Sequence, residues 1–169
     1  MKSRTALIAL TLLMLGQSAI AREPEEQLAP VPFDAESVLL PAYPKPENLV
    51  RFDADASAYQ IYVDATTITV GDDEVVRYVL VLKTAGGASN VSYEGLRCTA
   101  RDRTTYAFGR NDGTWVRSRH PDFEDMPTAA NRRFFRELAD GVFCNRGVIA
   151  GTPADMARAI AHPHRYDSR

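Results

Sequence analysis

The sequence predicts an α+β fold: an antiparallel meander sheet of about five strands with a C-terminal helix packed on one face, plus a short final helix. Between residues 59 and 119, segments rich in β-branched and aromatic residues follow one another with short turns between them, which is the pattern of an antiparallel meander. After His120 the apolar residues recur with helical spacing instead. The two cysteines, Cys98 and Cys144, lie one in each of these regions.

The expected strands are each bounded by residues that favour turns. They are Tyr59–Val70, Val75–Leu82, Ala88–Cys98, Thr104–Arg110 and Thr114–Arg119. The second is the most apolar, so we expect it to be central in the sheet. Gly71-Asp72-Asp73 and Gly86-Gly87 supply the first two reversals, and Asn111-Asp112-Gly113 is a strong hairpin signal before the last strand.

The first expected helix is Thr128–Asp140. Its residues Ala130, Phe134 and Leu138 recur at i, i+4 and i+8, so they share one face, while arginines occupy the other. Gly141 is expected to end this helix, because glycine tolerates the left-handed conformation of a helix C-terminus.

A second, short helix is expected from Pro153 to about Ile160. Thr152 is its N-cap, and Asp155 stands three residues later in a capping-box arrangement. The last residues, 163–169, are expected to form a loose tail.

The N-terminus has the features of a cleaved signal peptide, residues 1–21. Lys2 and Arg4 precede an apolar run, Ala6–Leu15, and Ala19-Ile20-Ala21 offers small residues where a signal peptidase cleaves. The apolar run is shorter than the roughly 20 residues that a membrane span needs, and no later segment approaches that length. We therefore expect an exported chain, periplasmic or secreted, with no transmembrane segment after cleavage.

The mature chain divides by composition into a Pro-rich acidic arm, residues 22–47, and a single α+β domain, residues 48–162. Six of the ten prolines lie in the first part, and proline fixes φ and removes a donor, so regular structure is not expected there. Its beginning, REPEEQLAPVP, has the composition of a disordered tether. Its second half is more apolar and is expected to lie along the domain, with a short helical turn at Asp34 to Leu39.

Charge is distributed unevenly along the mature chain. Removal of Lys2 and Arg4 changes the formal net charge from −2 to −4. Acidic residues dominate residues 22–75, whereas residues 76–119 carry a net charge of +5. One interpretation places the acidic arm beside a basic sheet face, and the other makes that face an anion-binding surface. A nucleic-acid partner is not expected for an exported chain of this net charge.

Cys98 and Cys144 are expected to form one disulfide, because the compartment is oxidising and the number of cysteines is even. No C-x-x-C motif is present, and neither cysteine has a histidine beside it, which disfavours catalysis or metal binding. His162 and His164 lie close together near the C-terminus, but a zinc site needs further ligands in a rigid setting. No metal and no cofactor are predicted.

Glu94, in the middle of the third expected strand, is the residue most like a catalytic group. A carboxylate on a buried face could serve as a general acid or base. The favoured alternative is a structural ion pair with Arg77 or Arg97 across the sheet, because no second carboxylate or nucleophile stands at a suitable spacing. Asp64, which precedes two threonines, is interpreted as a turn or bulge residue rather than as an acid group.

Arginines concentrated in the second half of the expected sheet form a candidate binding surface. They are Arg97, Arg101, Arg103, Arg110, Arg117 and Arg119, with Tyr106 and Trp115 between them. Alternate residues of a strand share a face, so their guanidinium groups could form one patch that binds phosphate or carboxylate. The predicted contact residues are Tyr93, Glu94, Arg97, Arg110, Trp115, Arg117 and Arg119. The alternative is a solvated sheet face that the acidic arm balances.

Several segments resemble one protein family. VDATTITVGDDEVVRYVLVLKTAGGASNVSYEGLRC, YAFGRNDGTWVRSR and FCNRG resemble the CNP-one-like (CNP1-like) family of small bacterial envelope proteins, over roughly residues 45 to 162. The residues that match its motif are Arg77, Tyr78, Asn90, Tyr93, Glu94, Arg97 and Cys98. The resemblance implies a bacterial, exported, single-domain protein, and it supplies neither an activity nor a catalytic residue.

These observations favour a non-catalytic periplasmic binding or interaction module, whose partner is an anionic envelope component or another envelope protein. The alternative is a small periplasmic hydrolase that uses Glu94 as general acid or base. The sequence contains no glycine-rich phosphate loop, no G-x-S-x-G and no H-E-x-x-H, and this favours the binding module.

Overall fold

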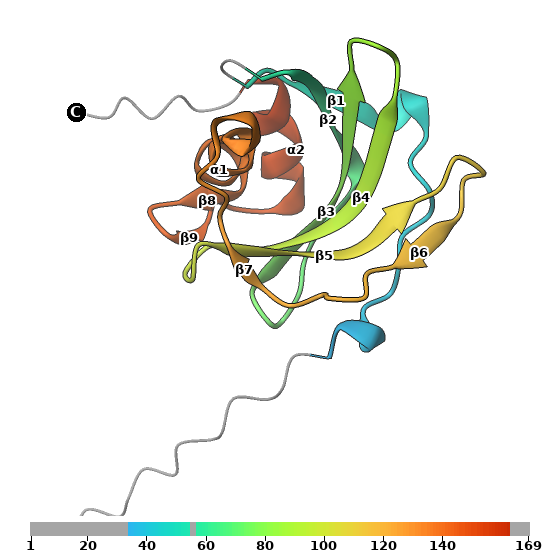
Figure 1. The fold of residues 1–169 in the computed structure, drawn as a ribbon. Helices are drawn as coiled ribbons and strands as arrows, with labels where there is room; N and C mark the ends of the chain where they lie inside the picture. Colours follow the sequence, from blue (N-terminus) through green and yellow to red (C-terminus); the bar gives the residue numbers. More distant parts are fainter. Residues whose placement is uncertain (1–33, 55–56, 163–169) are drawn as a thin grey trace, which may run out of the picture. The chain divides into compact units, whose positions relative to one another are not determined.

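The computed structural model describes residues 34–54 and 57–162. The predicted signal peptide, the tether sequence before Asp34 and the predicted tail lie outside the described residues. Within the described part, the chain forms two single-turn 3-10 helices, then an antiparallel sheet, and then a group of short helices (Figure 1). None of the helices in this part is long and apolar enough to cross a membrane.

The sheet has seven strands, of which β1 to β6 form a meander in chain order while β7 pairs with β5. The strands are β1 (Leu49–Phe52), β2 (Tyr59–Val70), β3 (Val75–Thr84), β4 (Ser89–Arg97), β5 (Asp102–Gly109), β6 (Trp115–Arg117) and β7 (Glu124–Asp125). All pairings are antiparallel. The prediction of about five strands was therefore too low. The two missed strands, β1 and β7, have four and two residues, too few to show a clear alternating pattern.

The helical region after the sheet begins and ends later than predicted. It consists of η3 (Ala130–Arg132), α1 (Phe134–Leu138) and the π-helix η4 (Ala139–Phe143). Gly141 therefore does not end the helix. The physical reason is packing, because Phe143 is fully buried and its ring centroid lies 4.5 Å from that of Tyr78 in the sheet. A two-stranded hairpin follows, made of β8 (Cys144–Asn145) and β9 (Val148–Ile149).

The short final helix is α2 (Pro153–Ala161), and its N-terminus has the predicted capping box. The Thr152 hydroxyl accepts a hydrogen bond from the Asp155 N–H, and the Asp155 carboxylate accepts one from the Thr152 N–H. These bonds satisfy donors that the first turn of a helix leaves open. Met156 and Ile160 then become the buried face of the helix.

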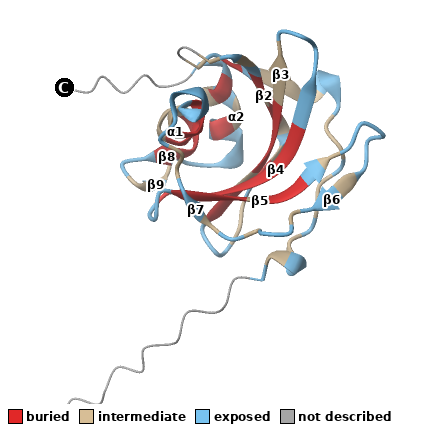
Figure 2. Cartoon of the chain, viewed as in Figure 1, coloured by how far each residue is buried: buried red, intermediate tan, exposed pale blue. Residues whose placement is uncertain are grey.

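One face of the sheet, here called the helix face, packs against these helices (Figure 2). The main cluster contains Val76, Tyr78 and Leu80 of β3, Phe134 and Leu138 of α1, and Met156 and Ile160 of α2. Every second residue of β3 contributes, as expected for a strand with one face toward these helices. Cys98 and Cys144 belong to the same cluster and form the predicted disulfide across a separation of 46 residues.

The opposite face, here called the arm face, packs against residues 34–48, which include the described part of the predicted arm 22–47 and are called the arm from here on. A second cluster joins Val79, Tyr93 and Tyr106 of the sheet to Val38 and Leu40 of the arm, among others. The arm is mostly extended and contains η1 (Ala35–Ser37) and η2 (Pro46–Asn48), so the helical turn predicted near its beginning is confirmed. The arm thus supplies a second layer to the side of the sheet that the helices leave open.

Candidate functional site

The central strand segment Tyr93-Glu94-Gly95 directs its residues to alternate faces of the sheet. In the register of β3 and β4, Tyr78 stands opposite Glu94 and Arg77 stands opposite Gly95. Glu94 therefore shares the helix face with Tyr78, whereas Tyr93 and Gly95 belong to the arm face. The predicted contact residues Tyr93 and Glu94 consequently belong to two different environments.

Glu94 lies beneath α1 and is paired with Arg103 rather than with Arg77 or Arg97, so the predicted partners were wrong. Its side chain is 2% exposed and that of Arg103 is 11% exposed. The Thr105 hydroxyl completes the group, accepting a 2.7 Å hydrogen bond from Arg103 and donating one of 3.2 Å to Glu94. This arrangement is a buried ion pair in which the Arg103 Nη2, the Glu94 Oε2 and the Thr105 hydroxyl are linked by hydrogen bonds.

The surroundings of this ion pair join the sheet to the helical region. The guanidinium carbon of Arg103 lies 4.2 Å from the centroid of the Phe135 ring, so the arginine stacks beneath α1. Burial, together with the nearby charge of Glu94, raises the pKa of Tyr78 far above its ordinary value. Glu94 is thus enclosed by structural contacts. This placement disfavours a role as general acid or base toward a ligand on the arm face.

On the arm face, Arg77 is fixed by a carboxylate and supported by an aromatic ring. Its guanidinium donates two hydrogen bonds to the Asp73 carboxylate, of 3.0 and 2.5 Å. The guanidinium carbon lies 5.6 Å from the centroid of the Tyr106 ring. The hydrogen bond from Arg77 lowers the pKa of the Asp73 carboxyl below its usual value, while burial raises the pKa of Tyr106 to about 12.

Two glycines make this arrangement possible. A Cβ atom on Gly95 would lie 2.6 Å from the Tyr106 hydroxyl oxygen, so the missing side chain gives the tyrosine ring its place across β4. A Cβ atom on Gly71 would lie 2.3 Å from a carboxylate oxygen of Asp73 and 2.5 Å from a guanidinium nitrogen of Arg77. The glycines of the segments YEG and VGDD therefore shape the arm face around the Arg77 side chain.

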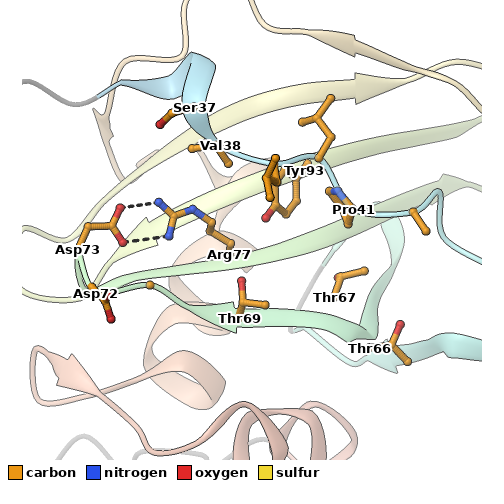
Figure 3. A pocket seen from close by; sticks show the side chains of 14 residues that line it. Ser37, Val38, Pro41, Thr66, Thr67, Thr69, Asp72, Asp73, Arg77 and Tyr93 are labelled. Carbon is orange, nitrogen blue, oxygen red and sulfur yellow. Dashed lines mark hydrogen bonds and ion pairs between the residues drawn. The ribbon is translucent and has the colours of Figure 1, made fainter.

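A cleft of about 960 Å³ lies between the arm and β2, with Arg77 and Tyr93 at its floor (Figure 3). One wall consists of arm residues 37–42. The other wall contains Thr66, Thr67 and Thr69 of β2 and the following turn, Gly71–Asp73. In Figure 3 the paired Arg77 and Asp73 lie at one end of the cleft and Tyr93 lies beside Arg77. We take this cleft as the candidate functional site.

The threonine wall is built on an irregularity in β2. The pairing of β2 with β3 shifts between Asp64 and Thr69. Asp64 is buried and accepts hydrogen bonds from the N–H and hydroxyl of Thr66, at 3.0 and 2.6 Å. The Thr67 hydroxyl accepts a hydrogen bond from the Val79 N–H. Asp64 is therefore the bulge residue that the sequence favoured, and its carboxylate stabilises the bulge from within.

The arm wall is held in place by β6 through hydrogen bonds to the arm backbone. Arg117 donates to the carbonyl oxygens of Ala35 and Val38, both at 3.1 Å. The Trp115 indole N–H donates to the Pro41 carbonyl at 2.9 Å. Leu39, between these fixed points, is 86% exposed. Two predicted contact residues, Trp115 and Arg117, thus form part of the support of the cleft.

The remaining arginines are distributed over several local interactions instead of one patch. Arg97 pairs with Asp102 and its guanidinium carbon lies 3.9 Å from the Phe123 ring centroid. Arg101 pairs with Asp140 through two hydrogen bonds. Arg110 and Arg119 are exposed. Since Arg103 and Arg117 are also engaged within the molecule, the six arginines do not form the single anion-binding patch that their spacing suggested.

The acidic arm is not paired with these arginines in the described residues. Asp34 caps η1 by accepting a hydrogen bond from the Glu36 N–H, and Arg117 contacts arm carbonyl groups rather than arm carboxylates. The acids before Asp34 lie outside the described residues. Among the residues that the structure describes, no group of three or more His, Cys, Asp or Glu side chains is placed to hold a metal ion.

Sequence reasoning missed the cleft, although two signals for it were present. The run Thr66-Thr67-Ile68-Thr69 places hydroxyl groups at an unusual density in one strand. The turn Gly71–Asp73 precedes Arg77 by a few residues, which is the spacing of a carboxylate and a guanidinium that meet across a tight turn. The arm wall has no such local signal, because its contacts join residues far apart in the chain.

The fold and the cleft define an α+β domain with helices on one face of an antiparallel sheet, an N-terminal arm on the other, and a ligand-sized cleft beside that arm. A family model matches residues 29–161, and the chain belongs to the CNP1-like family. The resemblance found in the motif segments is thereby confirmed. No curated protein and no solved structure matches the chain.

Proposed function

We propose that this chain is a non-catalytic binding module of the bacterial periplasm, and that the cleft between the arm and β2 is its contact surface. The observation that carries the proposal is the Arg77 guanidinium at the floor of the cleft, fixed by Asp73 and supported by Tyr106. A polar group that is already held in one geometry loses little entropy when it binds a ligand. Such preorganisation is typical of recognition sites.

The placement of Glu94 supports binding over hydrolysis. A general acid must come within hydrogen-bond reach of the atom that it protonates. Glu94 belongs to the helix face and is occupied by Arg103 and Thr105, whereas the cleft lies on the arm face. The cleft floor carries the hydrogen-bonded pair of the Arg77 guanidinium and the Asp73 carboxylate, and the threonine wall carries hydroxyls. These groups are suited to holding a ligand.

The signal-like segment at residues 1–21 and the disulfide between Cys98 and Cys144 support export to an oxidising compartment. The test is the mass of the mature protein recovered from a periplasmic extract. We expect a chain that begins at Arg22. Retention of residues 1–21 on a protein confined to the cytoplasm would contradict this part of the proposal.

The contact surface is tested by photo-cross-linking in living cells. A photoreactive benzoylphenylalanine replaces Thr69 in the cleft wall, and in a matched control it replaces Thr128, an exposed threonine that precedes the helical region. We expect an adduct from position 69 and none from position 128. An adduct from position 128 alone, or none from position 69, would show that the cleft is not the contact surface.

A further inference from the structure

We infer that the cleft binds an uncharged, hydroxyl-rich ligand, namely a neutral saccharide, rather than an anionic group. This inference rests on the proposed function and specifies the ligand of the same site. It follows from the charges that line the cleft, from the hydrogen-bonding capacity of its polar groups, and from the geometry of the β2 wall.

The charges in the cleft disfavour an anion. The ionised side chains that line it are Asp72, Asp73 and Arg77, so the lining carries more negative than positive charge. Arg77 is neutralised by two hydrogen bonds from its guanidinium to Asp73. A phosphate or carboxylate would have to replace Asp73 and would then lie beside two carboxylates, which costs free energy for like charges at short distance.

The polar groups of the cleft match the groups of a sugar. Each sugar hydroxyl both donates and accepts, and the paired Arg77 and Asp73 present donors and acceptors side by side in a fixed plane. The Thr69 hydroxyl and the Tyr93 side chain also line the cleft, and a threonine hydroxyl can both donate and accept. The arm residues Val38 and Pro41 add an apolar wall on which the C–H groups of a sugar ring can pack.

The β2 wall disfavours an extended peptide as the alternative ligand. A peptide that adds to a sheet edge needs a regular row of free backbone donors and acceptors. Here the bulge interrupts that row, because the Thr66 N–H is bonded to the Asp64 carboxylate. The Thr69 hydroxyl lies along this wall instead. The hydroxyls of Thr66 and Thr67 donate to Asp64 and accept from Asn48 and Val79, so each keeps one lone pair that can accept from a ligand. The wall is therefore suited to ligand hydroxyls rather than to a ladder of peptide bonds.

The test is an NMR titration of the 15N-labelled mature protein with three probes. These are a panel of neutral oligosaccharides (oligomers of N-acetylglucosamine, of glucose and of mannose), oligogalacturonate as an anionic sugar, and an uncharged unstructured peptide. We expect saturable shifts of the Thr69, Arg77 and Tyr93 amides with at least one neutral oligosaccharide. Thr69→Val should raise its Kd about three- to tenfold, the effect of losing one hydrogen bond, while Thr128→Val leaves the Kd unchanged.

Three results would overturn the inference. They are tighter binding of oligogalacturonate or of the peptide at the cleft, neutral-sugar shifts that map elsewhere on the domain, and no saturable shift with any neutral oligosaccharide. The cross-link at position 69 separates this failure from failure of the proposed function. If that adduct forms while the neutral sugars do not bind, the cleft is a contact surface for another ligand class. If neither occurs, both proposals fail.

Discussion

Two arginine–carboxylate pairs lie on neighbouring strands but on opposite faces of the sheet, and their surroundings differ. Glu94 with Arg103 is enclosed beneath α1, and both side chains are at most 11% exposed. Asp73 with Arg77 lines the cleft, where the Arg77 side chain is 12% exposed, much like Arg103, but the carboxylate side chain of Asp73 is 44% exposed. The same chemistry therefore contributes to folding on the helix face and is accessible to a ligand on the arm face.

The largest effect is expected from Glu94→Gln on the helix face. The substitution keeps the shape of the side chain but leaves the Arg103 guanidinium buried without its carboxylate, which costs about 3–5 kcal/mol for a buried pair. Denaturant unfolding at neutral pH measures the change in the free energy of unfolding. If the free energy of unfolding fell by less than about 1 kcal/mol, the pair of Glu94 and Arg103 would contribute no more than a surface ion pair. The ion pairs on the two faces of the sheet would then not differ in their contribution to stability.

The disulfide provides the next largest effect, also on the helix face. Replacing Cys98 and Cys144 together by Ser removes a link across 46 residues, and we expect the free energy of unfolding to fall by about 2–4 kcal/mol. Mass spectrometry of the alkylated, exported wild type should show no free thiol. Two alkylated cysteines in that experiment would contradict the disulfide directly.

Gly95→Ala tests the packing of the Tyr106 ring against β4 on the arm face. The new Cβ would lie 2.6 Å from the Tyr106 hydroxyl oxygen, so the ring must move, and overpacking of this kind costs about 1–3 kcal/mol. Gly86→Ala is the matched control, because the nearest atom to its Cβ is 3.9 Å away. Equal stability of the two variants would show that Tyr106 does not need the space over Gly95.

The strands were predictable from sequence because their signal is local. The runs of β-branched and aromatic residues in β2 and β3 mark strands by themselves, and the capping box of α2 lies within four residues. The partner of Glu94 was missed for a different reason. Side chains alternate between the two faces of a strand, so Glu94 and Arg97 lie on opposite faces and cannot pair. In addition, the pairing of β4 with β5 shifts between Tyr93 and Glu94, so the sequence does not reveal which β5 residue stands opposite Glu94.

The arm wall of the cleft could not be predicted from the sequence. Its hydrogen bonds from Trp115 and Arg117 join residues that are 74 to 82 positions apart, and they end on backbone carbonyl groups that every residue possesses. No side-chain pattern marks such a contact. The spacing of the arginines therefore suggested a ligand-binding surface. In the folded chain, Arg117 instead donates hydrogen bonds that hold the arm.

Arg117→Ala distinguishes this structural role from an anion patch. The loss of two exposed hydrogen bonds to the arm should lower the free energy of unfolding by about 1 kcal/mol and speed hydrogen exchange in the arm. Arg119→Ala, two residues further along the chain and also exposed, should change stability by less than about 0.5 kcal/mol. Equal effects of the two variants would refute the specific contact between Arg117 and the arm.

The smallest effect is expected from Asp73→Asn in the cleft. Because Asp73 is partly exposed, solvent screens its attraction to Arg77, and the loss at neutral pH should stay below about 1 kcal/mol. The hydrogen bond from Arg77 lowers the pKa of Asp73 below its ordinary value of 3.8, so the stabilisation is present above that pH and disappears as the pH falls through the lowered pKa. Unfolding curves of wild type and variant should therefore converge in acid. A stability difference as large as that of Glu94→Gln, or one that persists in strong acid, would show that the cleft pair is structural and that the two faces of the sheet use their ion pairs alike.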